Sequence, residues 1–248
     1  LGLIAKDQGD YQHALELHER SRTISQQCGY KIGEVHSATL QSIAAYWQGN
    51  YDRAEELARR CVAMREQLGE YAQMTYANEI VAMAMARQGD LAAGMRLLEE
   101  CLAQFRGVNN LMGIPLILND MGQVAHLQGD WPAALALHRQ ALTAALAVND
   151  RRRVAFCLEG VAMASVAGEL ATTQRHENAA QVLAAACELR QTLRAPLPPS
   201  ETHFYNAAIS RLHHMLSDEQ FAAAWAAGAL LSMDAAAAVA EGLARQAG

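Results

Sequence analysis

A short tripeptide recurs four times in this chain, at a spacing of forty residues. The copies are Gln8-Gly9-Asp10, Gln48-Gly49-Asn50, Gln88-Gly89-Asp90 and Gln128-Gly129-Asp130. A period of roughly 20 to 50 residues is typical of stacked repeats, in which each unit packs mainly against its neighbours. The spacing therefore predicts an array of repeated units. Because such arrays mostly present binding surfaces, it directs attention away from a catalytic pocket.

The residues after each tripeptide recur at helical spacing. A large apolar residue comes first, then a small residue, a leucine and a second small residue, in steps of three and four. These steps place all four on one face of a helix, so we expect them to be core positions. In chain order the four sets are Tyr11, Tyr51, Leu91 and Trp131; Ala14, Ala54, Gly94 and Ala134; Leu17, Leu57, Leu97 and Leu137; and Ser21, Cys61, Cys101 and Ala141.

The ends of these helices are marked as well. The acid or amide of each tripeptide, at 10, 50, 90 and 130, is a residue type that caps a helix N-terminus, and the preceding glycine lets the chain reverse. Residue types that tolerate a left-handed conformation recur at Gly29, Gly69, Asn109 and Asn149. The pattern predicts helices at about 10–28, 50–68, 90–108 and 130–148, each preceded by another helix.

These residues resemble the tetratricopeptide repeat. Leu1-Gly2 and Met121-Gly122 match its first-helix Leu-Gly, and the alanines at 14, 54 and 134 match its second-helix alanine. The unit is longer than the usual 34 residues, Gly94 departs from the alanine, and no proline closes each unit. The resemblance implies an all-α fold, a right-handed superhelix of antiparallel helix pairs. It covers about five hairpins in residues 1–195, the first of them truncated, and is followed by a helical capping segment, 196–248.

The fifth unit breaks the period. We expect Gly168-Glu169 to replace the tripeptide, and an extra stretch, Thr172–Glu177, to precede a helix at about 178–193. The prolines at 196, 198 and 199 interrupt helix, and further helices are expected at about 201–216, 218–230 and 232–245. Their expected caps are Ser200, Ser217 or Asp218, and Ser232.

Four stretches near this end resemble the close of the repeat region in bacterial multidomain signal-transduction ATPases of the STAND class. They are Leu158–Ala162, Ala179–Ala186, Leu193–Pro199 and Phe221–Trp225. The resemblance implies a non-catalytic sensor or interaction arm of a transcription or signalling regulator, with the ATPase upstream of this segment. Its partner would be another protein, or the ATPase or output domain of its own parent chain. A metabolite bound in the same groove is the alternative.

The resemblance also implies which residues line the groove, because in this family the first helix of each unit forms the concave face. A solvated surface explains the polar members equally well, although aromatic residues with polar groups are favoured in recognition surfaces. Carried onto this sequence, the candidates are Lys6, Asp7, His36, Tyr46, Trp47, Tyr76, Glu79, Arg87, Asn119, Gln123 and His126.

Composition and missing motifs exclude other classes of function. The net charge of −6 leaves no basic footprint for nucleic acid, and the apolar run Phe221–Leu231 is shorter than the roughly 20 residues that cross a bilayer. The sequence holds no phosphate-binding loop and no hydrolase or metalloprotease motif, and neither its five dispersed cysteines nor its histidines have metal-site spacing. We expect no catalytic residues, cofactor or metal, reduced thiols and a cytoplasmic location.

Overall fold

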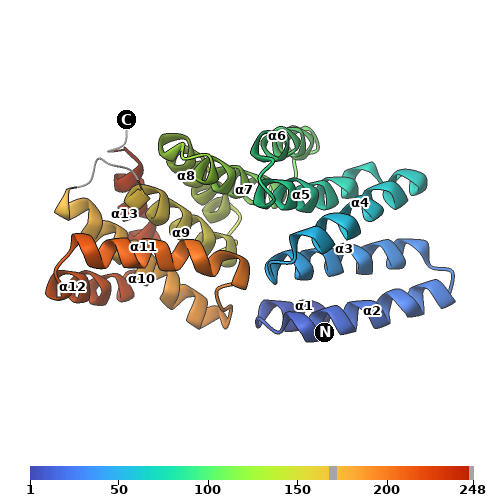
Figure 1. Ribbon diagram of the computed structural model, residues 1–248, viewed down its shortest axis with the longest axis horizontal. Coiled ribbons are helices and arrows are strands. Elements are labelled where there is room, and N and C mark those ends of the chain that lie inside the picture. The colour runs from blue at the N-terminus through green and yellow to red at the C-terminus, as the bar shows by residue number, and fades with distance from the viewer. Residues whose placement is uncertain (168–171, 246–248) are drawn as a thin grey trace. The chain divides into compact units, whose positions relative to one another are not determined.

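The computed structural model describes residues 1–167 and 172–245, and these form helices joined by short turns, without a strand (Figure 1). The chain forms two compact units. The first holds Leu1–Val108 together with Pro196–Glu201, and the second holds Asn109–Ala195 together with Thr202–Gly248. The boundary at residue 195 that the sequence suggests between repeats and cap stays a prediction.

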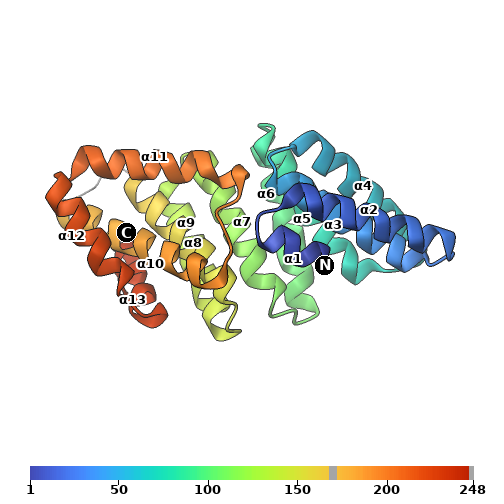
Figure 2. The ribbon, with the colours of Figure 1, turned by 90° about the horizontal axis from the view of Figure 1, so that it is seen from below.

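The first unit is a stack of three helix hairpins, in which each helix packs on the next one along the chain (Figures 1 and 2). The predicted second helices of these hairpins are confirmed, within a residue or two at each end. In chain order the helices are α1 (Gly2–Asp7), α2 (Tyr11–Gln27), α3 (Lys31–Trp47), α4 (Tyr51–Leu68), α5 (Tyr71–Arg87) and α6 (Leu91–Gly107).

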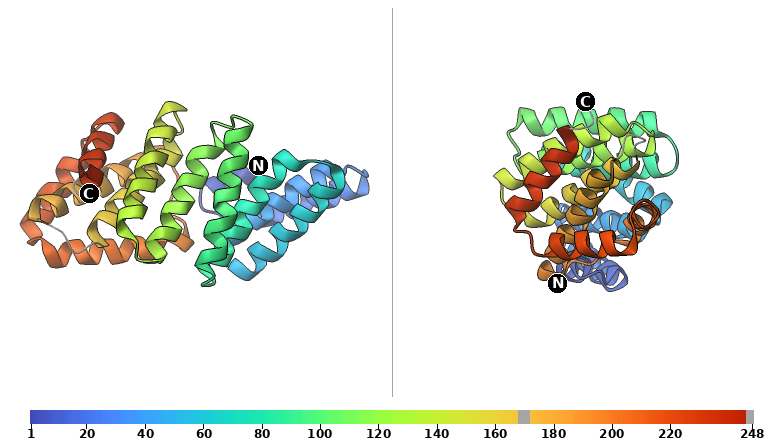
Figure 3. Two further views of the ribbon diagram at one scale, coloured as in Figure 1. Left: turned by 90° about the horizontal axis from the view of Figure 1, so that it is seen from above. Right: turned by 90° about the vertical axis from the view of Figure 1, so that its left-hand side faces the viewer.

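The second unit holds two further hairpins and the helices that follow them. Helices α7 and α8 form the fourth hairpin and α9 and α10 the fifth, while α12 and α13 pack on α10 (Figures 2 and 3). The helix α11 begins in the part of the chain that belongs to the first unit and continues in the second. The bounds are α7 (Gly113–Leu127), α8 (Trp131–Ala147), α9 (Arg151–Ala167), α10 (Thr173–Leu193), α11 (Pro199–Met215), α12 (Asp218–Ala229) and α13 (Met233–Arg245).

The recurrent tripeptides are the turns within these hairpins, as predicted. Their glycines have φ between +77° and +105°, a region that costs other residues energy. The acid or amide that follows accepts a hydrogen bond from the backbone amide three residues later, at 3.1 Å for Asp10 and 3.0 Å for Asp130. Gly29, Gly69, Asn109 and Asn149 also have positive φ, so the predicted left-handed helix ends are confirmed.

Two local predictions are wrong. The stretch Thr172–Glu177 is not an insertion before a helix, because α10 begins at Thr173 and the Thr172 hydroxyl accepts from the Arg175 amide at 3.2 Å. Ser200 does not cap α11, because that helix already begins at Pro199, a residue favoured in a first turn. The predicted Gly168-Glu169 turn lies outside the described residues. The caps Ser217 and Ser232 are confirmed.

The predicted core stripe is correct at the small residues 14, 54, 94, 134, 61, 101 and 141, which are buried, but wrong at Ser21, which is exposed, and at the leucine position. Three of the four recurrent leucines are only half-buried, whereas the next position in each helix is fully buried: His18, Ala58, Leu98 and His138. Sixteen residues before each of these comes a small residue of the partner helix: Gly2, Ser42, Ala82 and Gly122. A β-carbon on Gly122 would lie 2.7 Å from the His138 ring, so the glycine provides the space that the histidine fills.

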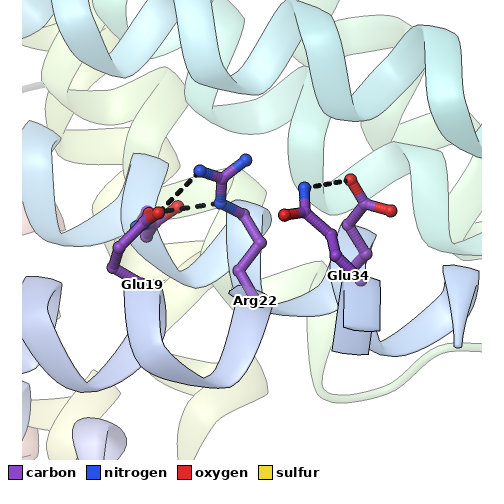
Figure 4. Close-up of polar contacts among 5 residues, drawn as sticks. Glu19, Arg22 and Glu34 are labelled. Atoms are coloured by element: carbon purple, nitrogen blue, oxygen red, sulfur yellow. Dashed lines mark hydrogen bonds and ion pairs between the residues drawn. The ribbon is translucent and has the colours of Figure 1, made fainter. Parts of the chain in front are cut away.

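Polar side chains bridge α2 and α3 of the first unit (Figure 4). Glu19 accepts from Arg22 on its own helix at 2.7 Å and from Gln41 of α3 at 2.7 Å. Gln26 donates to Glu34 across the same pair of helices, also at 2.7 Å. These hydrogen bonds lower the pKa of both carboxyl groups. The two helices are therefore joined by charge-assisted hydrogen bonds as well as by apolar packing.

Buried histidines make the fold sensitive to acid. His18, His138 and His176 are 4%, 1% and 2% exposed, and burial lowers the pKa of all three, that of His138 to about 3. A histidine in the unfolded chain titrates near pH 6.5. Below that pH the unfolded chain therefore binds protons at these histidines that the native chain does not bind. We expect constant stability above about pH 6.5. Below it, each histidine removes up to about 1.4 kcal/mol per pH unit until its native pKa is reached.

Urea unfolding between pH 7.5 and 5 measures this effect, because carboxyl groups contribute little in that range. Replacing buried His138 by glutamine is expected to reduce the dependence on pH, and His13→Gln, on the exposed face of α2, serves as the control for a histidine substitution. An identical urea midpoint at pH 7 and pH 5.5 for the unaltered chain would contradict the prediction.

Candidate functional site

The C-terminal ends of α1, α3 and α5 present side chains from equivalent positions of three successive units. The Arg87 Nε donates a hydrogen bond to the Tyr46 hydroxyl at 3.2 Å, which joins α5 to α3. The Lys6 ammonium lies 5.8 Å from the centre of the Trp47 ring, which joins α3 to α1, and it pairs with Asp7 at 2.8 Å. Five of the predicted groove residues therefore come together here. We call Lys6, Asp7, Tyr46, Trp47 and Arg87 the A-helix face, because they lie on the first (A) helix of each hairpin.

Arg87 is held by an acid from far along the sequence. Its Nη2 lies 2.7 Å from a carboxylate oxygen of Glu201, and the two side chains are only 4% and 8% exposed. Tyr51 closes the group, with its ring centre 5.5 Å from that of Tyr46. The buried guanidinium is thus held by a phenol and a carboxylate of the same chain as acceptors.

Burial and charge shape the ionisation of this group in opposite ways. Burial by itself lowers the pKa of Arg87, but the charge interactions with Tyr46 and Glu201 outweigh it, so the pKa lies above its ordinary value. Burial raises the pKa of Tyr51, and the negative charge of Glu201 adds to that effect while Arg87 opposes it. At neutral pH Arg87 is therefore positively charged.

The segment that carries Glu201 lies against the first unit. A β-carbon added to Gly9 would lie 2.6 Å from Pro196 Cγ, so the turn after α1 and this proline are in close contact. Pro198, Ser200 and Glu201 are buried. Residues 195–198 have no regular secondary structure and lead directly into α11. A short proline-rich stretch of this chain thus occupies the neighbourhood of the A-helix face.

The other candidates in the first unit are not gathered at this point. Tyr76 packs on Phe105 of α6, with ring centres 4.9 Å apart. Glu79 is 7% exposed and lies within the buried part of α5. His36 is exposed on α3, close enough to His18 to lower its pKa. Of these three residues, only His36 is open to a ligand in this structure.

The candidates in the second unit have different surroundings. Asn119 is 1% exposed, and its Oδ1 lies 3.1 Å from His138 Nδ1, so it supports a buried histidine. His126 stands edge-on to Trp131, with ring centres 4.8 Å apart, and helps to line a cavity of about 240 Å³ with Phe204. Gln123 is half-buried on the same helix. Of these three predicted groove residues, Asn119 lies in the core and His126 lines the cavity.

Sequence reasoning missed Glu201 and Pro196. The prolines indicated an interrupted helix, but no local pattern links position 201 to position 87. A weak signal does exist: an acid follows a proline-rich stretch, which is a common composition of recognition segments. The contact of this segment with the repeats depends on the path of the whole chain, so the composition of the segment alone does not predict it.

The described residues give no sign of a metal centre, since no group of three or more histidine, cysteine or acidic side chains among them could hold an ion. Within the same ranges, no helix has the length and apolarity to cross a membrane. The A-helix face combines the charged groups of Lys6 and Arg87 with the rings of Tyr46 and Trp47.

The described helices, packed in consecutive pairs, define a helical-repeat protein. The profile of the tetratricopeptide repeat matches residues 1–67 and 73–147, which is more than half of the chain. The chain therefore belongs to the tetratricopeptide-repeat family, whose repeats generally act as non-catalytic scaffolds in protein–protein interaction. No curated protein matches it.

Proposed function

We propose that this chain is the non-catalytic interaction or sensor arm of a signalling or transcription regulator, and that it binds a protein segment along the A-helix face. The partner is another protein or another domain of the parent chain. The observation that carries the proposal is the convergence of Lys6, Trp47, Tyr46 and Arg87, from three successive units, on one surface. The resemblance of the C-terminal half to signal-transduction ATPases supports the regulatory setting.

The composition of the face suits recognition more than solvation. Tyrosine, tryptophan and arginine are the residues that most often dominate binding energy at protein interfaces. Trp47 is half-buried, and it combines ring surface with a nearby cation. Trp47 and Arg87 occupy the same repeat position in consecutive units, and Tyr46 directly precedes Trp47, which favours binding over solvation.

Site-specific photocrosslinking in cells tests this proposal. A photoreactive amino acid replaces Trp47 or the exposed His36 in the full-length parent protein, and Glu99, exposed on the opposite helix of a hairpin, serves as the matched control. We expect a discrete protein adduct, or an internal crosslink to another domain, at positions 47 and 36. Equal labelling at position 99, or no adduct at either test position, would overturn the proposal.

A cavity supports small-molecule sensing as a second candidate. It measures about 480 Å³ and lies between α5 and α6, away from Arg87, with Tyr71, Met74, Asn78 and Gln104 in its wall. Small-molecule sites usually have volumes of roughly 300 to 1,000 Å³. A metabolite that raises the melting temperature of the chain, but not that of an Asn78→Leu variant, would favour this function. A broad library without such a compound would count against it.

A further inference from the structure

The A-helix face already has an occupant in this structure, and the occupant belongs to the same chain. Pro196–Glu201 is the only segment beyond Val108 that belongs to the first unit. It approaches the turn after α1 through Pro196 and reaches Arg87 of α5 through Glu201. An incoming partner segment would therefore meet this stretch before it met the repeats.

The buried ion pair restricts what can replace the segment. The Arg87 side chain is 4% exposed; its Nε donates to Tyr46 and its Nη2 pairs with Glu201. Withdrawal of Glu201 without a substitute would leave a buried charge without its counterion, which is strongly unfavourable. A partner that brings its own carboxylate avoids this penalty, because Arg87 is paired both before and after the exchange. The planar guanidinium also favours a carboxylate over a neutral acceptor.

The backbone of the segment adds a second requirement. Residues 195–198, with prolines at 196 and 198, form no helix, and Pro199, Ser200 and Glu201 make the first turn of α11. A stretch that is already extended loses little conformational entropy when it binds. The stretch Pro-Leu-Pro-Pro-Ser-Glu thus joins a stiff, extended backbone to a first helical turn that carries a carboxylate.

We propose that Pro196–Glu201 is an internal competitor for the partner, and that the partner is an acidic segment preceded by an extended, proline-containing stretch. This inference rests on the proposed function and names the partner class and the regulation of the same face. The tethered segment acts at a high effective concentration, so it lowers the apparent affinity for any external ligand. Only a segment of the same chemistry, or one presented at comparable effective concentration, displaces it.

A fluorescent peptide with the chain's own sequence from Ala195 to His203 tests the competition. We expect it to bind the full chain carrying Glu201→Ala at least about 10-fold more tightly than the unaltered chain, since the variant leaves Arg87 open to the carboxylate of the peptide. A peptide with glutamine in place of glutamate is expected to bind the variant at least about 10-fold more weakly. Fluorescence anisotropy measures both affinities.

Two further variants keep the test decisive. Glu201→Gln preserves the shape of the side chain and replaces the alanine variant if that one fails to fold, while Glu188→Ala removes an exposed acid elsewhere and should bind like the unaltered chain. Equal affinity for unaltered and Glu201-substituted chains, or for the glutamate and glutamine peptides, would overturn the inference. If photocrosslinks at position 47 persist in that case, the face binds a partner and the segment is only structural.

Discussion

Replacing Glu159 by glutamine is expected to lower the free energy of unfolding by about 3 to 5 kcal/mol. Glu159 of α9 accepts two hydrogen bonds from Arg190 of α10, at 2.5 and 2.6 Å, and the side chains are only 3% and 8% exposed. The guanidinium also lies 4.2 Å from the centre of the Phe156 ring. Loss of the carboxylate leaves a charge buried between two helices without its counterion, and no nearby solvent can compensate.

Urea unfolding followed by circular dichroism at pH 7 measures this loss. The matched control is the double variant Glu159→Leu with Arg190→Met, which replaces the pair by apolar residues of similar volume. Such replacements are often neutral or stabilising, so we expect the double variant to recover most of the stability. A single variant that loses less than about 1 kcal/mol would show that the pair is not a desolvated one.

Adding one methyl group to Gly228 is expected to lower the free energy of unfolding by about 1 to 3 kcal/mol. A β-carbon at this position of α12 would overlap the backbone of Gln181 in α10, and backbone cannot swing aside as a flexible side chain can. The substitution therefore forces α12 away from α10. This packing loss exceeds the gain of roughly 1 kcal/mol that alanine brings to a helix interior.

Gly242→Ala provides the control for this prediction. Gly242 lies inside α13, and nothing approaches its missing side chain within 4 Å. There, only the helix propensity changes, so the stability is expected to rise by up to about 1 kcal/mol. Thermal melts of the two variants should thus shift in opposite directions. If Gly228→Ala were as stable as Gly242→Ala, the close approach of α12 and α10 would be wrong.

The sequence predicts the repeat boundaries well because their causes are local. An aspartate at 10 or 130 meets amides only three residues away, and the glycine before it needs a conformation that few other residues adopt. Such interactions are complete within a turn of chain. The number of hairpins and the ends of their second helices follow from them, as does the assignment to an all-α class.

The side chains that fill the core are less predictable. Helical spacing favoured the leucines at 17, 97 and 137, yet the neighbouring residues, two of them histidines, are the ones fully buried. A difference of one position turns a side chain by about 100° around the helix, and which direction faces the partner depends on how the helices cross. The glycines at 2 and 122 are visible in the sequence, but which histidine each of them faces is known only once the packing of the two helices is known.

In the candidate site, too, the residues fixed by the repeat are predictable and those brought in by tertiary packing are not. Tyr46, Trp47 and Arg87 could be placed on first helices because the repeat fixes their phase. Their partner Glu201 could not, since it is 114 positions away from Arg87 and belongs to no repeat. Asn119 carried the polar character of a ligand residue, but its hydrogen bond is spent on His138. Polarity alone does not separate a surface that binds from a core that is satisfied.

The pairing of a small residue with a larger one sixteen positions later has a consequence for how such an array changes length. The pairs Gly2 with His18 and Ala82 with Leu98 each lie within one hairpin, formed by a first helix and its own second helix. Excision of 31–70 would remove α3 and α4 and leave both pairs whole. Excision of 51–90 would delete as many residues but set Ser42 opposite Leu98. We therefore expect that gain or loss of units preserves the core pairing only when it adds or removes whole hairpins that begin with a first helix.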